Sequence, residues 1–432
     1  MDLDKNHLNA LLIAKIHTQR LIQNYTLRDL AKITGLSHGY INKIEQGVTN
    51  LTESSLTAIQ KALNFSWDTS QSLSDDFSSI RNKLYKHLVY AEYSMAYDHA
   101  NKLYNDRHIY LNSPLFIDYY LIMVMYIQHA YRLLHLRDEY VDILMLLETN
   151  LTEDQYELYA LQMSMYYHYA RHDVDKALNY LNQQQALAKR RDLLAINYFV
   201  TGMVYGSHYK TFKQSTDYIN KAHTLFQEQN NFIRLMHVKT VKQSLLVYLK
   251  QSKEFLQLNY DTTNYAKIKN EPIMHKESLK TRAFYYMMQE QFEESLRVLN
   301  QFEDSHGGDY YFIKTYVLYR LAYHVEALHL IQSFKHVNPI DRHGLYALGL
   351  EVIEHSINKP KNETLISMIK TFADKAIAQG NYGMIRVSYY FVSREFESLR
   401  RYKECFEYSH KLLKIIQTIV GREEDHNEAR TL

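Results

Sequence analysis

The fold is decided in residues 25–67, which read YTLRDLAKITGLSHGYINKIEQGVTNLTESSLTAIQKALNFSW. This stretch predicts two short helices joined by a tight turn. Gly35 can adopt the positive φ that such a turn demands, and Ser37 can cap the second helix with its hydroxyl oxygen. Ala31 is small enough to let the two helices approach, and Ile41 packs the second helix against the first. The first turn of the second helix therefore points outward.

Helices are also predicted on both sides of this pair. Residues 5–23 carry leucines and isoleucines at helical spacing and predict a preceding helix. The second helix of the pair, 37–46, ends at Gly47, because glycine is favoured directly after a helix C-terminus. Thr52 then begins a closing helix, TESSLTAIQKAL, whose apolar residues complete a small core. An outward second helix in such a domain has the geometry that enters a DNA major groove.

The composition indicates a long, nearly neutral and mostly helical chain. It has 432 residues, with 50 Lys or Arg and 48 Asp or Glu, and a formal net charge of +2. Residues 1–70 hold seven basic and six acidic side chains, a net charge of only +1. This balance argues against a chain coated in nucleic acid and allows one small DNA-binding face. Only 4 prolines and 12 glycines interrupt the chain, which favours long helices.

The expected cellular location follows from features that the sequence lacks. Its one cysteine, Cys405, cannot form a disulfide within the chain, which suits a reducing compartment. The N-terminus MDLDKNHLNALL has two aspartates and no long apolar core, so it does not read as a signal peptide. No run approaches the roughly 20 apolar residues of a membrane span. We expect a cytoplasmic protein with no membrane partner.

From residue 80 to about 420 the pattern is helical, without strand-like alternation, and it repeats weakly. Segments in which a bulky or charged residue precedes a helix begin at Tyr140, Val174, Phe212, Lys253, Phe292, His324 and Tyr402. The successive offsets from 140 to 324 are 34, 38, 41, 39 and 32 residues. A period in the mid-thirties is typical of tetratricopeptide-like helix pairs. Such pairs stack to bury a continuous core and leave a concave groove.

No arrangement typical of an enzyme or of a bound cofactor is present. The sequence lacks the phosphate-binding loop G-x-x-x-x-G-K-S/T and the zinc motif H-E-x-x-H. His168 and His172 have the i, i+4 spacing of a metal pair, but 22 histidines make chance pairs expected. Carboxylate pairs such as Glu293 and Glu294 are typical of solvated helix faces. We therefore expect no catalytic residues, no metal and no cofactor, and a protein that is not an enzyme.

Residues 8–66 resemble the helix-turn-helix domain of lambda-type repressors and the XRE family. The resemblance rests on the turn spacing, on the I-x-K-I-E-x-G ending at 41–47, and on the leucine-patterned helices that follow. The chain departs from the family at the start of the first motif helix, where Thr-Gln-Glu is replaced by Thr26, Leu27 and Arg28. The family's glutamine contact is therefore absent, and we expect Arg28 to reach a phosphate instead.

The resemblance implies which side chains meet DNA. His38, Tyr40 and Asn42 are expected at base edges, with Lys43 nearer the backbone, and asparagine can pair bidentately with adenine. Phosphate contacts fix the register of such a domain, whereas base contacts specify the sequence. The alternative interpretation of each side chain is ordinary polarity on a helix surface. The full set of expected DNA-binding residues is Thr26, Arg28, Ser37, His38, Tyr40, Asn42 and Lys43.

The chain as a whole resembles the peptide-pheromone-responsive regulators of Gram-positive bacteria and their phages, the Rgg, PlcR, PrgX, NprR and AimR group. The resemblance is specific in the helix-turn-helix and architectural in the repeats. It implies an all-α fold in which a lambda-repressor-like helix-turn-helix domain precedes a tetratricopeptide-like superhelix. The expected boundaries are 1–66 for the DNA-binding domain, 67–80 for a linker, 81–420 for the repeats and 421–432 for a polar tail.

The same resemblance implies a cytosolic, quorum-sensing homodimer that binds a double-stranded DNA operator and a short signalling peptide. Related groups use groove asparagines to clamp the peptide backbone, and we expect the candidates on the first helix of each repeat. Asn197 and Thr201 share a helix face there, and Arg282 and Lys314 have the charge to meet a carboxylate. Ordinary polar positions are the alternative for each. The expected peptide-binding residues are Asn197, Thr201, Tyr205, His237, Thr240, Arg282 and Lys314.

Two other functions are compatible with the sequence. The repeats could bind and inhibit a partner protein, as the related repeat phosphatases without a DNA-binding domain do. The chain could also be a dimeric repressor in which the repeats only dimerise and no peptide is needed. Deleting residues 1–66 would leave a partner-inhibiting function intact and would abolish a DNA-binding one.

Overall fold

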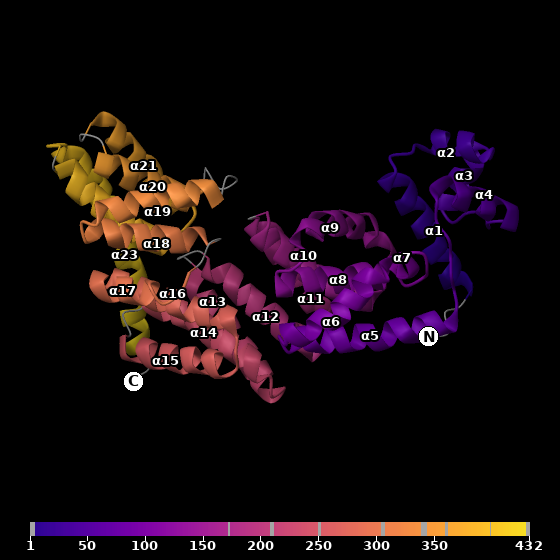
Figure 1. The fold of residues 1–432 in the computed structure, drawn as a ribbon, viewed down its shortest axis with the longest axis horizontal. Coiled ribbons are helices and arrows are strands. Elements are labelled where there is room, and N and C mark those ends of the chain that lie inside the picture. Colours follow the sequence, from indigo (N-terminus) through magenta and orange to yellow (C-terminus); the bar gives the residue numbers. More distant parts are fainter. Residues whose placement is uncertain are drawn as a thin grey trace. The chain divides into compact units, whose positions relative to one another are not determined.

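The computed structural model describes residues 5–171, 173–207, 211–248, 252–303, 307–337, 344–358, 362–397 and 399–428. Within these ranges the regular elements are helices and no strand is present (Figure 1), so the all-α prediction is confirmed. The chain divides into two compact units. Unit 1 is Met1–Val200 with Leu225–Arg234, and unit 2 is Thr201–Thr224 with Leu235–Leu432.

Four helices at the N-terminus form the predicted helix-turn-helix, and we call them the head. They are α1 Lys5–Ile22, α2 Leu27–Thr34, α3 His38–Glu45 and α4 Glu53–Leu63. Gly35 follows α2 with φ at 72°, in the left-handed region that the turn requires. The Ser37 hydroxyl caps α3 by accepting a hydrogen bond from the Tyr40 N–H at 3.2 Å. The turn, the cap and the second helix are therefore confirmed.

The head is closed around a small apolar core. Ile41 and Ile44 of α3 are fully buried against Leu30 of α2 and Ile59 of α4. Ile16 of α1 completes the contact from the other side. Because all four helices contribute, the orientation of α3 is fixed by packing and does not depend on the short turn alone.

The segment between the head and the repeats is shorter than the expected linker at 67–80. Helix α5, Gln71–Val89, begins inside that range. Phe77 and Ile80 are buried in the packing of α5 with α6 and α8. The serines and aspartates from residue 72 onward therefore belong to an amphipathic helix, whereas Asp68 and Ser70 precede it.

Helix α8 lies at the centre of the rest of unit 1. It contacts α5, α6, α9 and α10, and nearly all of its side chains are buried. Short 3-10 turns, η1 Leu134–Leu136 and η2 Glu148–Asn150, flank α9. The α-helices of this part are α6 Tyr93–Asn105, α7 Arg107–Tyr110, α8 Phe116–Ala130, α9 Arg137–Leu146, α10 Glu153–Tyr169 and α11 Val174–Leu187.

Three helices contain or border the points where the chain passes between the units. These are α12 Arg191–Gly206, α13 Phe212–Glu228 and α14 Phe232–Tyr248. The remainder of unit 2 consists of helix pairs and a π-helical turn, η4 Val392–Phe396. Its helices are α15 Ser252–Ile268, α16 Pro272–Met288, α17 Phe292–Leu299, α18 Gly308–Arg320, α19 His324–Val337, α20 Leu345–Asn358, α21 Glu363–Ala378, α22 Tyr382–Phe391 and α23 Tyr402–Glu428.

The predicted repeat segments coincide with the second helices of these pairs. Val174, Phe212, Phe292, His324 and Tyr402 are the first residues of α11, α13, α17, α19 and α23. One repeat was missed, because α21 begins at Glu363 without a bulky residue at its start. It lies 39 residues after 324 and 39 residues before 402, so the period continues through it.

The first helices of successive pairs in unit 2 form an inner row. α16 contacts α18, and α18 contacts α20, while α17, α19 and α21 each pack against two of the first helices. Figure 1 shows α18 to α21 stacked side by side. Gly349 of α20 makes the approach possible, since a Cβ there would lie 2.3 Å from the Phe312 ring of α18. We call α14, α16, α18, α20 and α22 the inner helices.

The C-terminal helix runs further than the expected boundary of the repeats. The backbone of α23 is helical to Glu428, inside the 421–432 range expected to be a polar tail. Residues 429–432 lie outside the described residues.

Candidate functional site

Helix α3 turns a polar face to solvent. His38, Gly39, Lys43 and Gln46 are exposed, and Asn42 between them is partly exposed. At about 100° per residue these five positions fall on one side, opposite the buried isoleucines. Within the described residues, no atom outside the helix backbone lies within 4 Å of a Cβ built on Gly39. Recognition of base edges in a major groove requires such an open polar face.

Two of the predicted DNA-binding residues act as helix caps. The Thr26 hydroxyl donates to the Asp29 carboxylate at 2.6 Å and accepts from the Asp29 N–H at 3.1 Å. The Ser37 hydroxyl caps α3 by accepting from the Tyr40 N–H alone. Arg28 is exposed on the first turn of α2. The free N–H groups at the starts of these helices, with Arg28 beside them, suit contacts with phosphate.

Tyr40 is fastened to the head by its hydroxyl group. The hydroxyl donates to the Asn50 carbonyl at 3.4 Å and lies 3.3 Å from the Ser55 hydroxyl, which donates to it. The Ser55 hydrogen bond lowers the pKa of Tyr40 below its ordinary value. This phenol therefore joins α3 to the start of α4, whereas His38 and Asn42 have no such anchor among the described residues.

Arg20 of α1 and Glu45 of α3 form a buried ion pair. The Arg20 Nε and Nη2 atoms donate to the Glu45 carboxylate at 2.6 and 2.7 Å, and His17 Nδ1 lies 2.7 Å from it. The side chains of Arg20 and Glu45 are only 8% and 6% exposed. Arg20 Nη1 also donates to the Tyr25 carbonyl at 2.8 Å. The pair therefore fixes the end of α3 against α1 and against the approach to α2.

The environment of Glu45 keeps it ionised. Burial by itself raises the pKa of a carboxyl group, but hydrogen bonds from Arg20 and His17 outweigh burial and lower the pKa of Glu45. Glu45 belongs to the I-x-K-I-E-x-G motif, whereas Arg20 and His17 lie outside any motif that the sequence shows. Arg20 lies 25 positions from Glu45, so only the shared arginine–carboxylate chemistry could have suggested the pair. We add these residues, and Gln46, to the site.

The head meets the first repeats at α8. Trp67, the chain's one tryptophan, packs edge-on against Phe116 with ring centroids 6.3 Å apart. The Asp68 N–H donates to the Asn112 carbonyl at 2.8 Å. Lys15 Nζ of α1 lies 5.6 Å from the Phe116 ring centroid. Lys15 is 6% exposed, and burial lowers its pKa to about 8.

A pocket of about 180 Å³ lies among the inner helices of unit 2. All five inner helices or their caps contribute to it. Polar groups come from α14, α16, α18 and the start of α22, and apolar side chains from α16, α18, α20 and α22. The lining residues are Ser244, Glu277, Lys280, Thr281, Phe284, Asp309, Ile313, Tyr346, Asn381 and Met384.

An ion-pair cluster forms one wall of this pocket. Lys280 Nζ lies 2.9 Å from the Glu277 carboxylate and 2.8 Å from the Asp309 carboxylate. Burial alone lowers the pKa of Lys280, but the charges of Asp309 and Glu277 outweigh it and raise the pKa above its usual value. Two carboxylates and one ammonium leave a formal charge of −1 on this wall. The wall therefore favours ligand groups that donate hydrogen bonds or carry positive charge.

Arg282 joins a buried polar network on another side of α16. Its Nε atom donates to Asn259 Oδ1 at 2.5 Å, and its Nη2 atom donates to the Thr263 hydroxyl at 2.9 Å. Asn259 Nδ2 in turn donates to Gln243 Oε1 at 2.6 Å. Burial lowers the pKa of Arg282. For Arg282 to contact a peptide as predicted, its side chain would therefore have to break its hydrogen bonds to Asn259 and Thr263 of α15.

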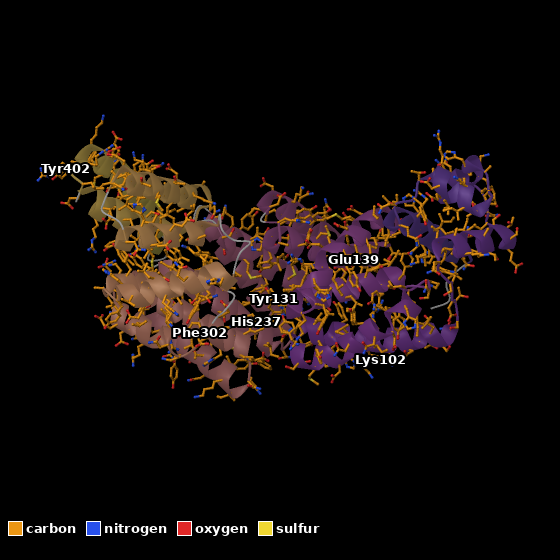
Figure 2. The ribbon with its side chains drawn as sticks, turned by 45° about the horizontal axis from the view of Figure 1, so that its top comes forward. Lys102, Tyr131, Glu139, His237, Phe302 and Tyr402 are labelled. Carbon is orange, nitrogen blue, oxygen red and sulfur yellow. The ribbon has the colours of Figure 1, made fainter. Side chains whose placement is uncertain are left out.

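The other predicted peptide-binding residues are spread over both units, and none of them lines the pocket. His237 (Figure 2) and Thr240 share the α14 face that carries Ser244 of the pocket. The remaining positions contact other parts of the protein. Asn197 Nδ2 donates to the Leu181 carbonyl at 2.9 Å, and Thr201 is buried. The Tyr205 ring stacks on Tyr218 with centroids 5.7 Å apart, and Lys314 donates to the Tyr310 hydroxyl at 3.1 Å. All seven stay predictions.

Of the two histidines at metal-pair spacing, His168 lies near the end of α10 and His172 lies outside the described residues. Within the described ranges, no group of three or more His, Cys, Asp or Glu side chains could hold a metal ion. None of the described helices combines the length and the apolar character that crossing a bilayer requires.

Comparison with known proteins identifies the head. Residues 16–69 match the helix-turn-helix family HTH_3, which confirms the motif inferred from the sequence. No curated protein matched the chain.

Solved structures match the helical repeats. A Rap protein complexed with competence and sporulation factor has a TM-score of 0.63 at 12% identity, over 81% of this chain and 99% of that chain. NprR in complex with its cognate peptide NprX has a TM-score of 0.59 at 14% identity, over 81% and 99%. The apo form of the quorum sensor NprR from B. thuringiensis has a TM-score of 0.52 at 14% identity, over 80% and 99%. At these identities the likeness shows the fold, and the helical-repeat prediction is confirmed.

Replacing Arg20 with Met should destabilise the head by about 3–5 kcal/mol, because Glu45 is then left buried without its main partner. The measurement is a urea titration of the full chain followed by the fluorescence of Trp67. Arg28→Met is the matched control, since Arg28 is exposed. Equal midpoints for the two variants would contradict the role given to the pair.

Replacing Lys15 with Met should stabilise the head at pH 7 by up to about 3 kcal/mol, the cost that burying the charge imposes. The folded-state pKa is about 8 and the unfolded one about 10.4. Between these values the unfolded state binds more protons, so wild-type stability rises with pH. The same urea titration at pH 7 and at pH 9.5 should show a smaller difference in unfolding free energy between wild type and Lys15→Met at the higher pH. An equal difference at both pH values would contradict the lowered pKa of Lys15.

Proposed function

We propose that the chain is a DNA-binding transcriptional regulator switched by a short peptide bound along the inner helices of unit 2. One observation carries the proposal. A single chain joins a helix-turn-helix with an open polar face on α3 to a repeat unit whose five inner helices share one pocket. The proposal assigns no catalytic role to any residue, and it places the protein in the cytoplasm.

The DNA half of the proposal rests on the chemistry of the head. Asn42 and His38 would read base edges, while Arg28, Lys43 and the capped N-termini of α2 and α3 would contact phosphates. A net charge of +1 over residues 1–70 gives one head little nonspecific affinity, because such affinity grows with the number of phosphates neutralised. Two heads on two half-sites would supply the remainder.

The peptide half rests on the pocket and on the repeat fold. A bound peptide presents many backbone N–H and C=O groups that must be satisfied. Asn381, Thr281 and the carboxylates of Glu277 and Asp309 could serve its donors and acceptors, and Phe284 could cover an apolar side chain. The Rap and NprR structures of similar fold were solved with competence and sporulation factor and with NprX. We extend peptide binding to this chain on that basis.

The switch would work by linkage between the two sites. A peptide that binds one arrangement of the repeats better than another shifts the population by its differential affinity. If that arrangement also sets the spacing of two heads, operator affinity changes with it. The sign of the change, activation or release, follows from which arrangement matches the operator's half-site spacing.

A homodimer would bring the two heads together, and α23 offers a surface for it. Tyr402, Phe406 and Leu413 are 63%, 71% and 39% exposed. Their spacing of four and seven residues puts them on one side of the helix. Tyr402 lies at the outer edge of unit 2 in Figure 2. An exposed apolar stripe of this kind is typical of an interface between helices.

A second candidate function is inhibition of a partner protein by the repeats, which the fold shared with a Rap protein favours. It differs from the first in what the head contributes. A partner-binding protein would keep its activity without residues 1–66, and the operator would have no effect on its peptide affinity.

Blocking the pocket should abolish the peptide response and spare DNA binding. Thr281 lines the pocket, and Thr281→Trp would fill it. Operator affinity is measured by fluorescence anisotropy with and without synthetic peptides encoded by small open reading frames beside the gene. In wild type a cognate peptide should change operator affinity by roughly 5- to 150-fold.

Thr371→Trp is the matched control, because Thr371 is exposed on the outer helix α21. Peptide-free operator affinity should be the same in wild type and in both variants. If peptide still changes the operator affinity of Thr281→Trp, the peptide does not bind in this pocket. If no candidate peptide changes the operator affinity of wild type, the proposed switch is wrong.

Introducing a charge into the α23 stripe should separate the subunits. Phe406→Glu buries a carboxylate in the proposed interface, which costs several kcal/mol unless it is paired. Sedimentation equilibrium at micromolar concentration should show wild type at twice the monomer mass of 51.4 kDa and the variant at that mass. Lys403→Gln controls for the change of charge, and a wild-type monomer would contradict the homodimer.

A further inference from the structure

Unit 2 contains a second pocket, which is separate from the pocket shared by the inner helices. It has a volume of about 170 Å³ and is formed by α13, α14 and α15. Its polar side chains are Asn220, His223, Lys239, Lys242 and Glu254. Four of these five carry nitrogen groups that can donate hydrogen bonds, so the pocket presents donors far more than acceptors.

The two pockets use opposite faces of α14. Ser244 lines the pocket of the inner helices. Lys242, two residues earlier, lies about 200° around the helix from Ser244, and Lys239, five residues earlier, lies about 140° around it. A ligand in the second pocket would therefore contact neither the inner face of α14 nor the peptide proposed to lie along it.

The two lysines of this pocket have no carboxylate partner within the described part of the chain. Neither Lys239 nor Lys242 forms an ion pair or a side-chain hydrogen bond there. Lys280 and Lys370 of the same unit, which are also partly buried, are each held by carboxylates. Glu254 is exposed at the edge of the pocket and lies beyond ion-pair distance of both lysines.

The two lysines also act on His223, which lines the same pocket. They are three residues apart on one helix, where side chains are neighbours and like charges repel. Burial, and then the charges of Lys239 and Lys242, lower the pKa of His223. The imidazole is therefore neutral at pH 7, and the formal charges of Lys239, Lys242 and Glu254 give the pocket a sum of +1. An anion would relieve the repulsion.

We propose that this pocket binds a small oxyanion, either free phosphate or the phosphoryl group of a small metabolite. The volume is below the roughly 300–1,000 Å³ of pockets that enclose drug-sized ligands, so it suits one compact anionic group. Lysine ammonium groups bind phosphate as point charges. The His223 N–H and the Asn220 amide supply directional donors on the opposite wall, from α13.

The test is isothermal titration calorimetry of the full chain with inorganic phosphate at constant ionic strength. Wild type should bind one phosphate per chain with a saturable isotherm. Lys239→Gln with Lys242→Gln should weaken binding at least tenfold. The matched control, Lys213→Gln with Lys253→Gln, removes the same charge from exposed positions of α13 and α15 and should bind as wild type does.

The outcomes separate the possibilities. An isotherm that does not saturate, or equal affinities in all three proteins, would overturn the proposal, because binding would then follow net charge and not the pocket. Thermal unfolding without phosphate checks that the pocket variant is folded. A second titration uses a nucleoside monophosphate: tighter binding than phosphate assigns the site to a phosphorylated metabolite, and equal or weaker binding assigns it to free phosphate.

Discussion

The first helices of the pairs are stable only when neighbouring helices cover their apolar faces. Helix α8 of unit 1 and the inner helix α18 carry apolar side chains around most of their circumference, and nearly all of these are buried. Each fully buried large apolar side chain contributes about 1.5–3 kcal/mol relative to exposure, so a single helix pair in water would lack most of its stabilisation. Stacking of pairs follows, and so does the close approach at Gly349. The proposed peptide pocket of unit 2 is lined by side chains of these stacked inner helices.

The head could be predicted residue by residue because its signals are local. A cap, a turn glycine and an apolar lock act within a few positions of one another, and Ser37, Gly35 and Ile41 do in the structure what their spacing predicts. Helix α5 begins inside the range expected to be a linker or a short helix, because serine and aspartate are common both in loops and on exposed helix faces. The Arg20–Glu45 pair joins positions 25 apart, beyond the reach of local patterns.

The sequence predicts that the repeats form a groove, but it does not predict which side chains line it. The repeat period located most of the second helices, because each begins with a similar pattern. The first helices are apolar or aromatic on most sides, so periodicity does not indicate which face is inner. Arg282 has the charge expected of a peptide contact, yet it donates to Asn259 and Thr263. Lys280, two positions earlier, lines the pocket.

The proposed function requires peptide and operator binding to be coupled in one molecule. Coupling free energy is reciprocal, so an operator must change peptide affinity by the same factor by which the peptide changes operator affinity. The direct measurement is the dissociation constant of a labelled cognate peptide for the full chain, with and without saturating operator DNA. We expect the two dissociation constants to differ by at least about fivefold. Equal constants would contradict it, even if peptide and DNA each bind well.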